Sequence, residues 1–392
     1  MKRTLYFEII KQLNHKNAIV ITGMRQVGKT TLMKMIYNEI KEAKLWFDFD
    51  NPMDILPFES KDYNKIYQEL VSQANQNKKI IVFIDEIQNY PEITKIIKYL
   101  IDHYGLKFIV TGSSNYYMRN LFPESLSGRK FLYELKPLSF AEFLYFKGFL
   151  SENEIVNFEM NVLLKEKTEY DYLKRNIYYN EFVEYGGFPE VALTGDLATK
   201  KLVLKNIFAS FFEKDIKVFT ELKDVRELRD LILLLAPRNG SMLDITKLSS
   251  ELGINRVKAY NYIEFLQGIF FLKLIPKFSR SIDRGVAAGK KIYFSDTGIL
   301  NLISNITDGQ LFETAVCNQL SNYGKLSFYN KRNTAEIDFI LNNEYAFEVK
   351  INATINDLTR LTKIAQSIGV KNWFLISKNF KNTDKTIYPH FI

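Results

Sequence analysis

The chain has 392 residues, of which 46% are hydrophobic and 25% charged, and its formal net charge is +8. This composition is typical of a soluble globular protein, and the length exceeds the roughly 100–200 residues of one domain. No apolar run approaches the roughly 18 residues of a membrane span, and the N-terminus lacks the apolar core of a signal peptide. The sequence therefore predicts a cytoplasmic protein of several domains that does not cross a membrane.

The residue types limit the chemistry that is available. A single cysteine, Cys317, excludes an intramolecular disulfide and a multi-cysteine zinc site, and we expect it to be buried. The three histidines, His15, His103 and His390, are far apart in sequence, which argues against a histidine metal cluster or a histidine-dependent nucleophilic triad. Catalysis must rest on carboxylates and lysines.

The first motif follows a short apolar run, Ala18–Thr22, which predicts a buried strand. Glycines in the motif let backbone N–H groups turn toward phosphate oxygens, Lys29 reaches the outer phosphates, and the Thr30 hydroxyl ligates magnesium. Residues 31–41 have helical spacing, so strand, loop and helix occur in the order that phosphate binding requires. We expect ATP and Mg²⁺ to bind to Gly23, Met24, Arg25, Gln26, Val27, Gly28, Lys29, Thr30 and Thr31.

A second apolar run, Lys79–Ile84, ends in two carboxylates, Asp85 and Glu86. Asp85 would hold magnesium, and Glu86 would polarise the attacking water, a role that needs no histidine. The alternative is a strand that merely ends in solvated acids. With the phosphate-binding loop upstream, the pair favours hydrolysis over binding alone.

Two more positions are candidates for contact with the γ-phosphate. A third apolar run, Lys107–Thr111, leads into a polar segment in which Asn115 is a candidate sensor, although a plain polar turn explains the neighbouring serines equally well. Arg129 just precedes a fourth apolar run and is a candidate arginine finger.

These motifs resemble the AAA+ branch of P-loop ATPases, in a family of bacteria and archaea. The matching pieces are GMRQVGKTT, FIDEIQ, VTGSS, LSGR and KPLSFAEF, in agreeing order and spacing over roughly residues 1–145. The resemblance implies an AAA+ core over this range and places Arg129 at or near the finger position. Whether Arg129 acts within one subunit or between subunits of a homo-oligomer stays open.

Residues 146–218 read as helical and suit the lid of an AAA+ module. The helical pattern is interrupted at Gly186-Gly187-Phe188-Pro189, and the resemblance implies the same turn. Residues 219–289 then predict a winged helix, with helices over 244–252 and 255–266, a turn at Gly253, and strands over 269–275 and 290–294.

A basic segment accompanies this predicted winged helix. Between Ile216 and Lys291 there are 14 Lys or Arg against 8 Asp or Glu, a net charge of +6. Such a segment favours a polyanion, although a solvated basic face or docking to a protein partner explains it too. The residues predicted to contact DNA are Arg256, Lys258, Asn261, Lys277, Arg280 and Arg284.

Residues 290–392 contain the pattern of a metal-dependent nuclease. Asp338 and the pair Glu348 and Lys350 lie on two runs that form a plausible hairpin, and Glu313 lies on a helix upstream. Glu313, Asp338 and Glu348 would hold Mg²⁺ or Mn²⁺, and Lys350 would stabilise charge or orient water. This set resembles the restriction-endonuclease-like fold and the domain of unknown function that commonly follows this ATPase type, including Lys291-Ile-Tyr-Phe-Ser-Asp296-Thr-Gly298.

The predicted architecture is therefore α/β: a P-loop AAA+ sheet, a helical lid, a winged helix and a restriction-endonuclease-like domain. The leading functional hypothesis is a DNA-associated ATPase whose C-terminal domain cleaves or only binds DNA. The alternative is a nucleotide-dependent switch that acts through a protein partner. A small-molecule kinase fits less well, because Asp85 and Glu86 favour water activation.

Overall fold

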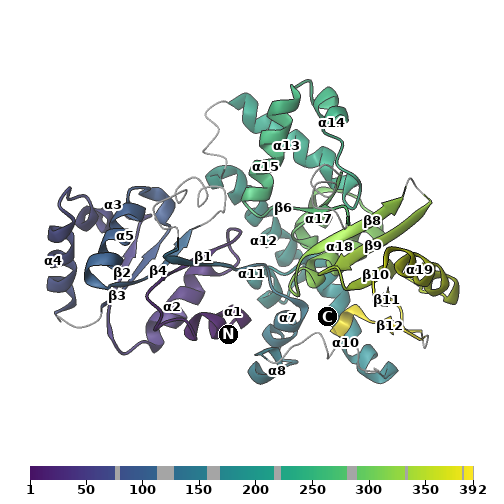
Figure 1. Cartoon of the computed structure of the whole chain (residues 1–392), viewed down its shortest axis with the longest axis horizontal. Helices are drawn as coiled ribbons and strands as arrows, with labels where there is room; N and C mark the ends of the chain where they lie inside the picture. The colour runs from purple at the N-terminus through teal and green to yellow at the C-terminus, as the bar shows by residue number, and fades with distance from the viewer. Residues whose placement is uncertain are drawn as a thin grey trace. The chain divides into compact units, whose positions relative to one another are not determined.

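The structure is a computed structural model that describes residues 1–75, 80–112, 128–156, 168–215, 222–279, 289–331, 334–381 and 384–391. The chain divides into two compact units, which we describe separately (Figure 1). The first unit is Met1–Lys136 with Gly268–Phe270, and the second is Pro137–Gln267 with Phe271–Ile392.

The first unit ends earlier than the boundary predicted at residue 145. Residues after Lys136 belong to the second unit because the backbone N–H of Leu138 donates to Gly187 O (2.7 Å), and the helix that follows contacts other helices of that unit. Apart from Gly268–Phe270, the later predicted domains lie in the second unit, and the divisions between them stay predictions.

A five-stranded sheet forms the centre of the first unit. All neighbouring strands run parallel, in the order β2-β3-β4-β1-β5. Strands β1, β3 and β4 are buried along their whole length, as expected for a parallel sheet covered by helices on both faces. The strands are β1 (Ala18–Thr22), β2 (Ala43–Asp48), β3 (Ile80–Asp85), β4 (Lys107–Gly112) and β5 (Lys130–Glu134).

Helices cover the two faces of this sheet. Leu70 of α4 and Ile97 of α5 pack with Val20 and Val82 in one apolar cluster, whereas Tyr37 of α2 packs edge-on against Phe83, whose side chain points to the opposite face. The arrangement matches the P-loop nucleoside triphosphatase fold that the sequence predicts. The helices of this unit are α1 (Thr4–Ile10), α2 (Lys29–Glu39), α3 (Pro52–Ile55), α4 (Tyr63–Ala74) and α5 (Ile93–Tyr104).

The second unit begins with helices, as the sequence predicts for its lid. They are α7 (Phe140–Phe146), α8 (Glu152–Val156), α10 (Glu169–Tyr185), α11 (Pro189–Leu193) and α12 (Leu197–Ser210), followed by a π-helical turn at Phe211–Asp215. Ser139 begins α7 with a capping box: its hydroxyl accepts from Glu142 N, and the Glu142 carboxylate accepts from Ser139 N.

Gly298 allows two helices of this unit to pack closely. A Cβ on Gly298 would lie 2.1 Å from the carbonyl oxygen of Tyr185, so α17 (Thr297–Ile303) approaches the end of α10 at a distance that only glycine permits. Asp296 begins α17, and its two carboxylate oxygens accept hydrogen bonds from Gly187 N (2.8 Å) and Ile299 N (2.9 Å).

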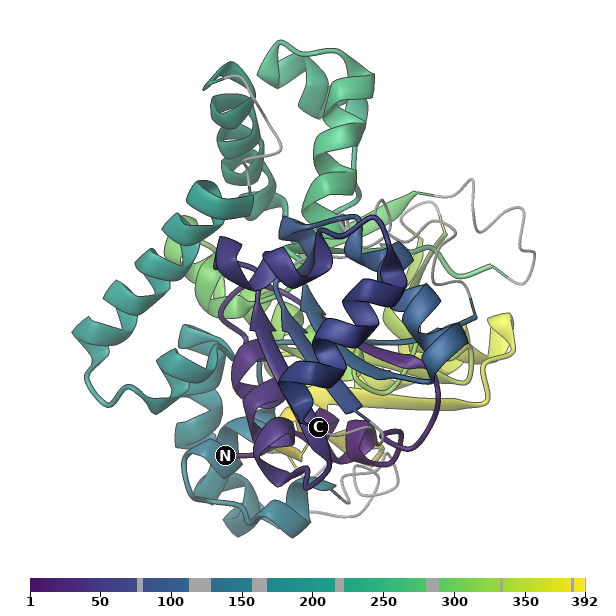
Figure 2. The same cartoon turned by 90° about the vertical axis from the view of Figure 1, so that its left-hand side faces the viewer.

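Three helices and a two-stranded ribbon follow, and the helices gather side by side in Figures 1 and 2. They are α13 (Leu222–Leu235), α14 (Ile245–Leu252) and α15 (Arg256–Gly268). The ribbon pairs β6 (Leu272–Pro276) antiparallel to β7 (Lys290–Phe294), and a single bridge joins Met242 to Lys291. The predicted turn at Gly253 is confirmed, since Gly253 has φ +65°. Asn255 caps the next helix, because its Oδ1 accepts from Lys258 N at 2.8 Å.

The C-terminal part of the second unit is a mixed sheet in the order β12-β11-β10-β9-β8. The predicted hairpin is confirmed, because β9 and β10 pair antiparallel. Its elements are α18 (Asp308–Leu320), β8 (Leu326–Lys331), β9 (Ala335–Leu341), β10 (Tyr345–Lys350), α19 (Ile355–Ile368), β11 (Asn372–Ser377) and β12 (Thr386–Ile387). Within the described residues, no helix is both long and apolar enough to cross a lipid bilayer.

Candidate functional site

The loop between β1 and α2 has positive φ values at three positions, two of which are glycines. Gly23, Gln26 and Gly28 have φ values of +146°, +61° and +96°. A Cβ on Gly23 would lie 2.1 Å from the carbonyl oxygen of Leu135, so the first glycine is needed for close packing as well as for its φ. The loop ends at Gly28, which has no side chain to cap the first amides of α2, and these N–H groups suit an anion.

Lys29 begins α2 and turns back over the loop. Its Nζ donates to the carbonyl oxygens of Gly23 (3.0 Å) and Met24 (2.8 Å), and the residue is 5% exposed. A buried ammonium needs such partners because its desolvation is costly. The lysine is thus held at the loop, where the outer phosphates of a nucleotide would attract it.

The other predicted loop residues differ in exposure. Met24 and Val27 are buried, Arg25 and Thr30 are half-buried, and Gln26 and Thr31 are exposed. Sequence reasoning missed Arg3, whose guanidinium donates to Val27 O (3.1 Å) and Lys136 O (2.8 Å). Arg3 therefore ties the loop to the segment after β5, a contact between positions so distant that no sequence pattern indicated it.

Asp85 ends β3, and Glu86 follows it. The hydroxyl of Thr111, on the neighbouring strand β4, donates to Asp85 Oδ1 and accepts from Glu86 N at 3.2 Å. Asp85 is 3% exposed, whereas Glu86 is half-buried, has φ +55°, and accepts a hydrogen bond from the side chain of Gln88. The carboxyl ends of β1 and β3 thus carry the two motifs that the sequence predicts for nucleotide chemistry.

Of the two candidate γ-phosphate contacts, the structure describes only Arg129. Asn115 lies outside the described residues. Arg129 lies at the amino end of β5, where its carbonyl accepts from Ala18 N (2.9 Å) and its side chain pairs with Asp102 (2.5 Å). The phosphate loop starts after Thr22, four residues further along β1, so Arg129 is at least about 13 Å from it. Arg129 does not reach the loop of its own subunit in this arrangement.

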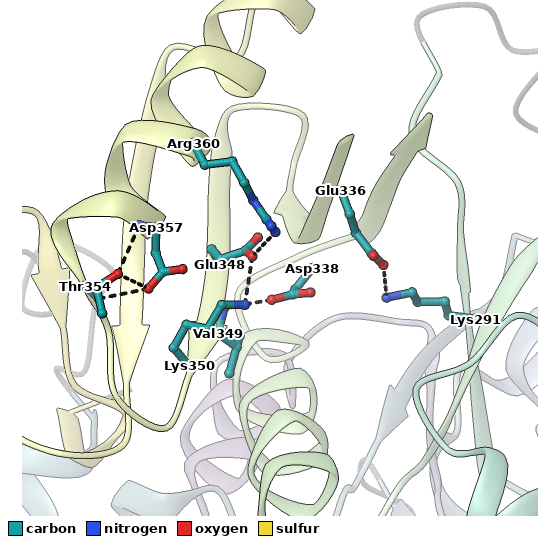
Figure 3. A network of polar contacts seen from close by, with 9 residues as sticks. All are labelled: Lys291, Glu336, Asp338, Glu348, Val349, Lys350, Thr354, Asp357 and Arg360. Atoms are coloured by element: carbon teal, nitrogen blue, oxygen red, sulfur yellow. Dashed lines mark hydrogen bonds and ion pairs between the residues drawn. The ribbon is translucent and has the colours of Figure 1, made fainter. Parts of the chain in front are cut away.

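In the second unit, the hairpin brings Asp338, Glu348 and Lys350 together (Figure 3). Asp338 Oδ2 accepts from Val349 N at 2.8 Å, and Lys350 Nζ donates to Glu348 Oε1 at 2.8 Å. Arg360 of α19, which sequence reasoning missed, donates to the same oxygen at 2.8 Å. Burial, with a smaller contribution from the Asp338 carboxylate, raises the pKa of Glu348 to about 7.

Glu313 approaches this group from α18. Burial raises its pKa to about 7, with a smaller contribution from Asp338, and burial likewise raises the pKa of Asp338. The Tyr293 hydroxyl donates to Glu313 Oε1 at 2.6 Å, and Lys291 pairs with Glu336 at 2.8 Å. Strand β7 therefore contributes two residues to the cluster. The sequence predicted β7 as a strand but did not indicate which side chains it would face.

The carboxylates of this cluster suit a hard divalent cation, but Glu348 among them is already paired with lysine and arginine side chains of the chain itself. Within the described part of the chain, no three His, Cys, Asp or Glu side chains are grouped closely enough to hold a metal ion. Glu348 is nevertheless 2% exposed, and its Oε2 has no hydrogen-bond partner among the described residues. Carboxylate oxygens are the ligands that Mg²⁺ and Mn²⁺ prefer, so the chemistry of Glu313, Asp338 and Glu348 suits such an ion, although their spacing in this structure does not form a three-ligand group.

The predicted DNA contacts are only partly exposed. Arg256 and Asn261 of α15 are exposed, and Lys277 is half-buried. Lys258 is half-buried, and its Nζ pairs with Asp224 (2.6 Å) and Glu227 (2.5 Å) of α13, hydrogen bonds that raise its pKa, so its contact with DNA stays a prediction. Lys258 therefore joins two helices of the unit. Arg280 and Arg284 lie outside the described residues.

Three known families match consecutive parts of the chain. Residues 15–144 match the AAA domain, residues 176–310 match a domain of unknown function (DUF8612), and residues 308–388 match another (DUF4143). The first match covers the P-loop, Asp85, Glu86 and Arg129. The first unit is therefore similar to AAA-type P-loop ATPases.

Curated relatives extend over most of the chain but carry no assigned function. An uncharacterized protein of Methanocaldococcus jannaschii is 28% identical over 92% of this chain and 80% of its own length. An uncharacterized protein of Haemophilus influenzae is 26% identical over 87% of this chain and 83% of its own length.

Among solved structures, the Walker-type ATPase PABY2304 of Pyrococcus abyssi is 15% identical, with a TM-score of 0.46 over 76% of this chain and 94% of that chain. The Orc1 protein of Aeropyrum pernix, in complex with DNA, is 13% identical, with a TM-score of 0.33 over 76% of this chain and 91% of that chain. The assignment of the fold rests on the sheet, the P-loop and the AAA domain match.

Proposed function

We propose that the chain binds ATP with Mg²⁺ in its first unit and hydrolyses it. The observation that carries this proposal is the phosphate loop, with Lys29 held over it, beside a buried Asp85 on the same edge of the sheet. Lys29 would neutralise the outer phosphates, Thr30 and Asp85 would hold magnesium, and Glu86 would orient water. Magnesium supplies charge neutralisation at the phosphates when it is bound.

Steady-state ATP turnover tests this proposal. Lys29→Ala should abolish turnover and weaken ATP binding, whereas Glu86→Gln should abolish turnover but leave binding intact. Lys34→Ala is the matched control, because Lys34 lies on the exposed side of the same helix. Turnover at the wild-type rate in Lys29→Ala would sink the assignment.

We further propose that the second unit contacts DNA through a winged helix. The order of the elements supports this proposal: α13, the bridge at Met242, α14, α15, β6 and β7 follow one another along the chain. In this order α15 takes the place of a recognition helix. Arg256 and Asn261 are exposed on α15, and the segment is basic. The alternative is a switch that responds to a protein partner.

ATP turnover with single-stranded, duplex and branched DNA separates these two functions. Stimulation by one form, lost in Arg256→Ala but kept in Lys223→Ala, which removes an exposed lysine of α13, supports a DNA substrate. Turnover that no DNA form changes supports the protein-partner switch.

For the C-terminal cluster, we propose a metal-dependent site that acts on a phosphodiester. The chemistry of Glu313, Asp338, Glu348 and Lys350 supports this proposal, and a site that only binds DNA is the alternative. Asp338→Ala should remove nicking of plasmid DNA in Mg²⁺ or Mn²⁺. Equal nicking by this variant would mean a contaminant or another site.

A further inference from the structure

Glu348 combines deep burial with an incomplete set of partners. The residue is 2% exposed, yet its Oε2 has no partner among the described residues, while Oε1 accepts from both Lys350 and Arg360. A buried carboxylate usually has all its oxygens satisfied. The free oxygen indicates that Glu348 is built to take another ligand.

The two cations on Glu348 differ in origin. Lys350 lies two residues away on the same strand, so it is always beside Glu348. Arg360 reaches in from α19, and its side chain is 58% exposed (Figure 3). Ion pairs with an exposed member are weak, because water competes for the charge. Arg360 is therefore the cation that can leave without disturbing the strand.

We propose that Arg360 is an internal counter-ion that occupies Glu348 until a divalent cation displaces it. This inference rests on the metal site of the proposed function. A guanidinium and a metal ion compete for the same carboxylate, because both need its negative charge and its lone pairs. The site then stays folded and neutralised without metal, and binding of a metal ion is coupled to release of Arg360 toward solvent.

Mn²⁺ binding tests this proposal in the full chain. The free Mn²⁺ signal in electron paramagnetic resonance measures affinity without nucleotide, in a Thr30→Ala background that silences the P-loop. Arg360→Gln should bind Mn²⁺ roughly two- to fivefold more tightly than its parent, the range expected for loss of an ion pair whose cation is exposed. Lys363→Gln is the control, because Lys363 is an exposed cation of the same helix.

The outcomes distinguish the inference from the site on which it rests. Mn²⁺ affinity in Arg360→Gln equal to or below that of Lys363→Gln would overturn the role of Arg360 and leave the metal site standing. Unchanged binding in Asp338→Asn would show that the ion sits elsewhere, which overturns the metal site too. Arg360→Lys keeps the charge on a shorter side chain and should show an intermediate gain, so it provides a second test if Arg360→Gln does not fold.

Discussion

Thr111 on β4 donates a hydrogen bond to the carboxylate of Asp85 on β3 and, through the same oxygen, accepts one from the backbone N–H of Glu86. One hydroxyl therefore holds the Asp85 side chain and the Glu86 backbone. Thr111→Val keeps the shape but removes the donor, so we expect ATP turnover to fall roughly tenfold, the effect of a buried carboxylate losing one hydrogen bond.

Thr111→Ser separates this positioning role from packing. Serine keeps the hydroxyl and loses the methyl group, so turnover should recover toward the wild-type kcat. If Thr111→Val turns over ATP like the wild type and only its thermal stability changes, Thr111 is a packing residue and its contact with Asp85 is incidental.

Much of the first unit could be predicted because its signals are local. Buried parallel strands are continuous apolar runs, and the P-loop has fixed spacing, so β1, β3 and β4 were found to within a residue or two. Arg3 and Thr111 were missed because each acts on a residue from another part of the chain. Periodicity along one strand or helix does not reveal its neighbours.

The second unit shows the same limit. The two helices around the turn at Gly253 and the β9–β10 hairpin were predicted from turn residues and alternation, and these elements are present. Lys258 was assigned to an exposed surface because helix periodicity does not show that α13 places Asp224 and Glu227 beside it. Arg360 and Lys291 were missed for the converse reason, since ordinary cations gain a role only from the carboxylates that the fold brings to them.

The position of Arg129 predicts that hydrolysis needs two copies of the chain. Because Arg129 lies at the opposite end of β5 from the phosphate loop, an arginine-finger role would place it against the γ-phosphate of a second subunit. Arg129→Ala and Lys29→Ala should each be inactive alone, and mixing them should restore turnover, since one supplies an intact loop and the other an intact arginine. Turnover of the mixture no greater than the sum of the two would contradict a role for Arg129 between subunits.

Gly298 provides a test of close packing between α10 and α17. Alanine normally favours a helix over glycine by about 1 kcal/mol, but a Cβ here would lie 2.1 Å from Tyr185 O. We therefore expect Gly298→Ala to lower the free energy of unfolding by about 1–3 kcal/mol, the usual result of overpacking. Gly309→Ala is the matched control, because it is a helical glycine of α18 whose Cβ would meet nothing closer than 3.9 Å.

Urea unfolding of both glycine variants measures the difference. Gly309→Ala should be neutral or stabilising, so only Gly298→Ala should lower the free energy of unfolding. Equal effects would mean that helix propensity alone determines the change in unfolding free energy and that the backbone at Tyr185 shifts to make room for the Cβ.

His390 predicts how the second unit responds to acid. It is buried between the rings of Tyr172 and Tyr179, at 4.3 and 4.4 Å between centroids, and Nε2 lies 3.1 Å from Asn176 Oδ1. Burial, with a smaller contribution from the positive charge of Arg175, lowers the pKa of His390 to about 3. The folded state thus holds a neutral imidazole, whereas the unfolded chain takes up a proton below pH of about 6.5.

Protonation therefore favours the unfolded state, and stability should fall as the pH drops from about 6.5 toward about 3. Between pH 7 and pH 4.5, His390 should account for a loss of about 2–3 kcal/mol. His390→Phe keeps the aromatic packing and cannot be protonated, so its unfolding free energy should fall less over this range. The chain has two tryptophans, one in each unit, so in a Trp46→Phe background the fluorescence of Trp373 follows the second unit alone during urea titration. Carboxylates titrate alike in both proteins, so only the difference between the two pH profiles reports on His390. Parallel profiles would mean that protonation of the buried imidazole does not cause the loss of stability at low pH.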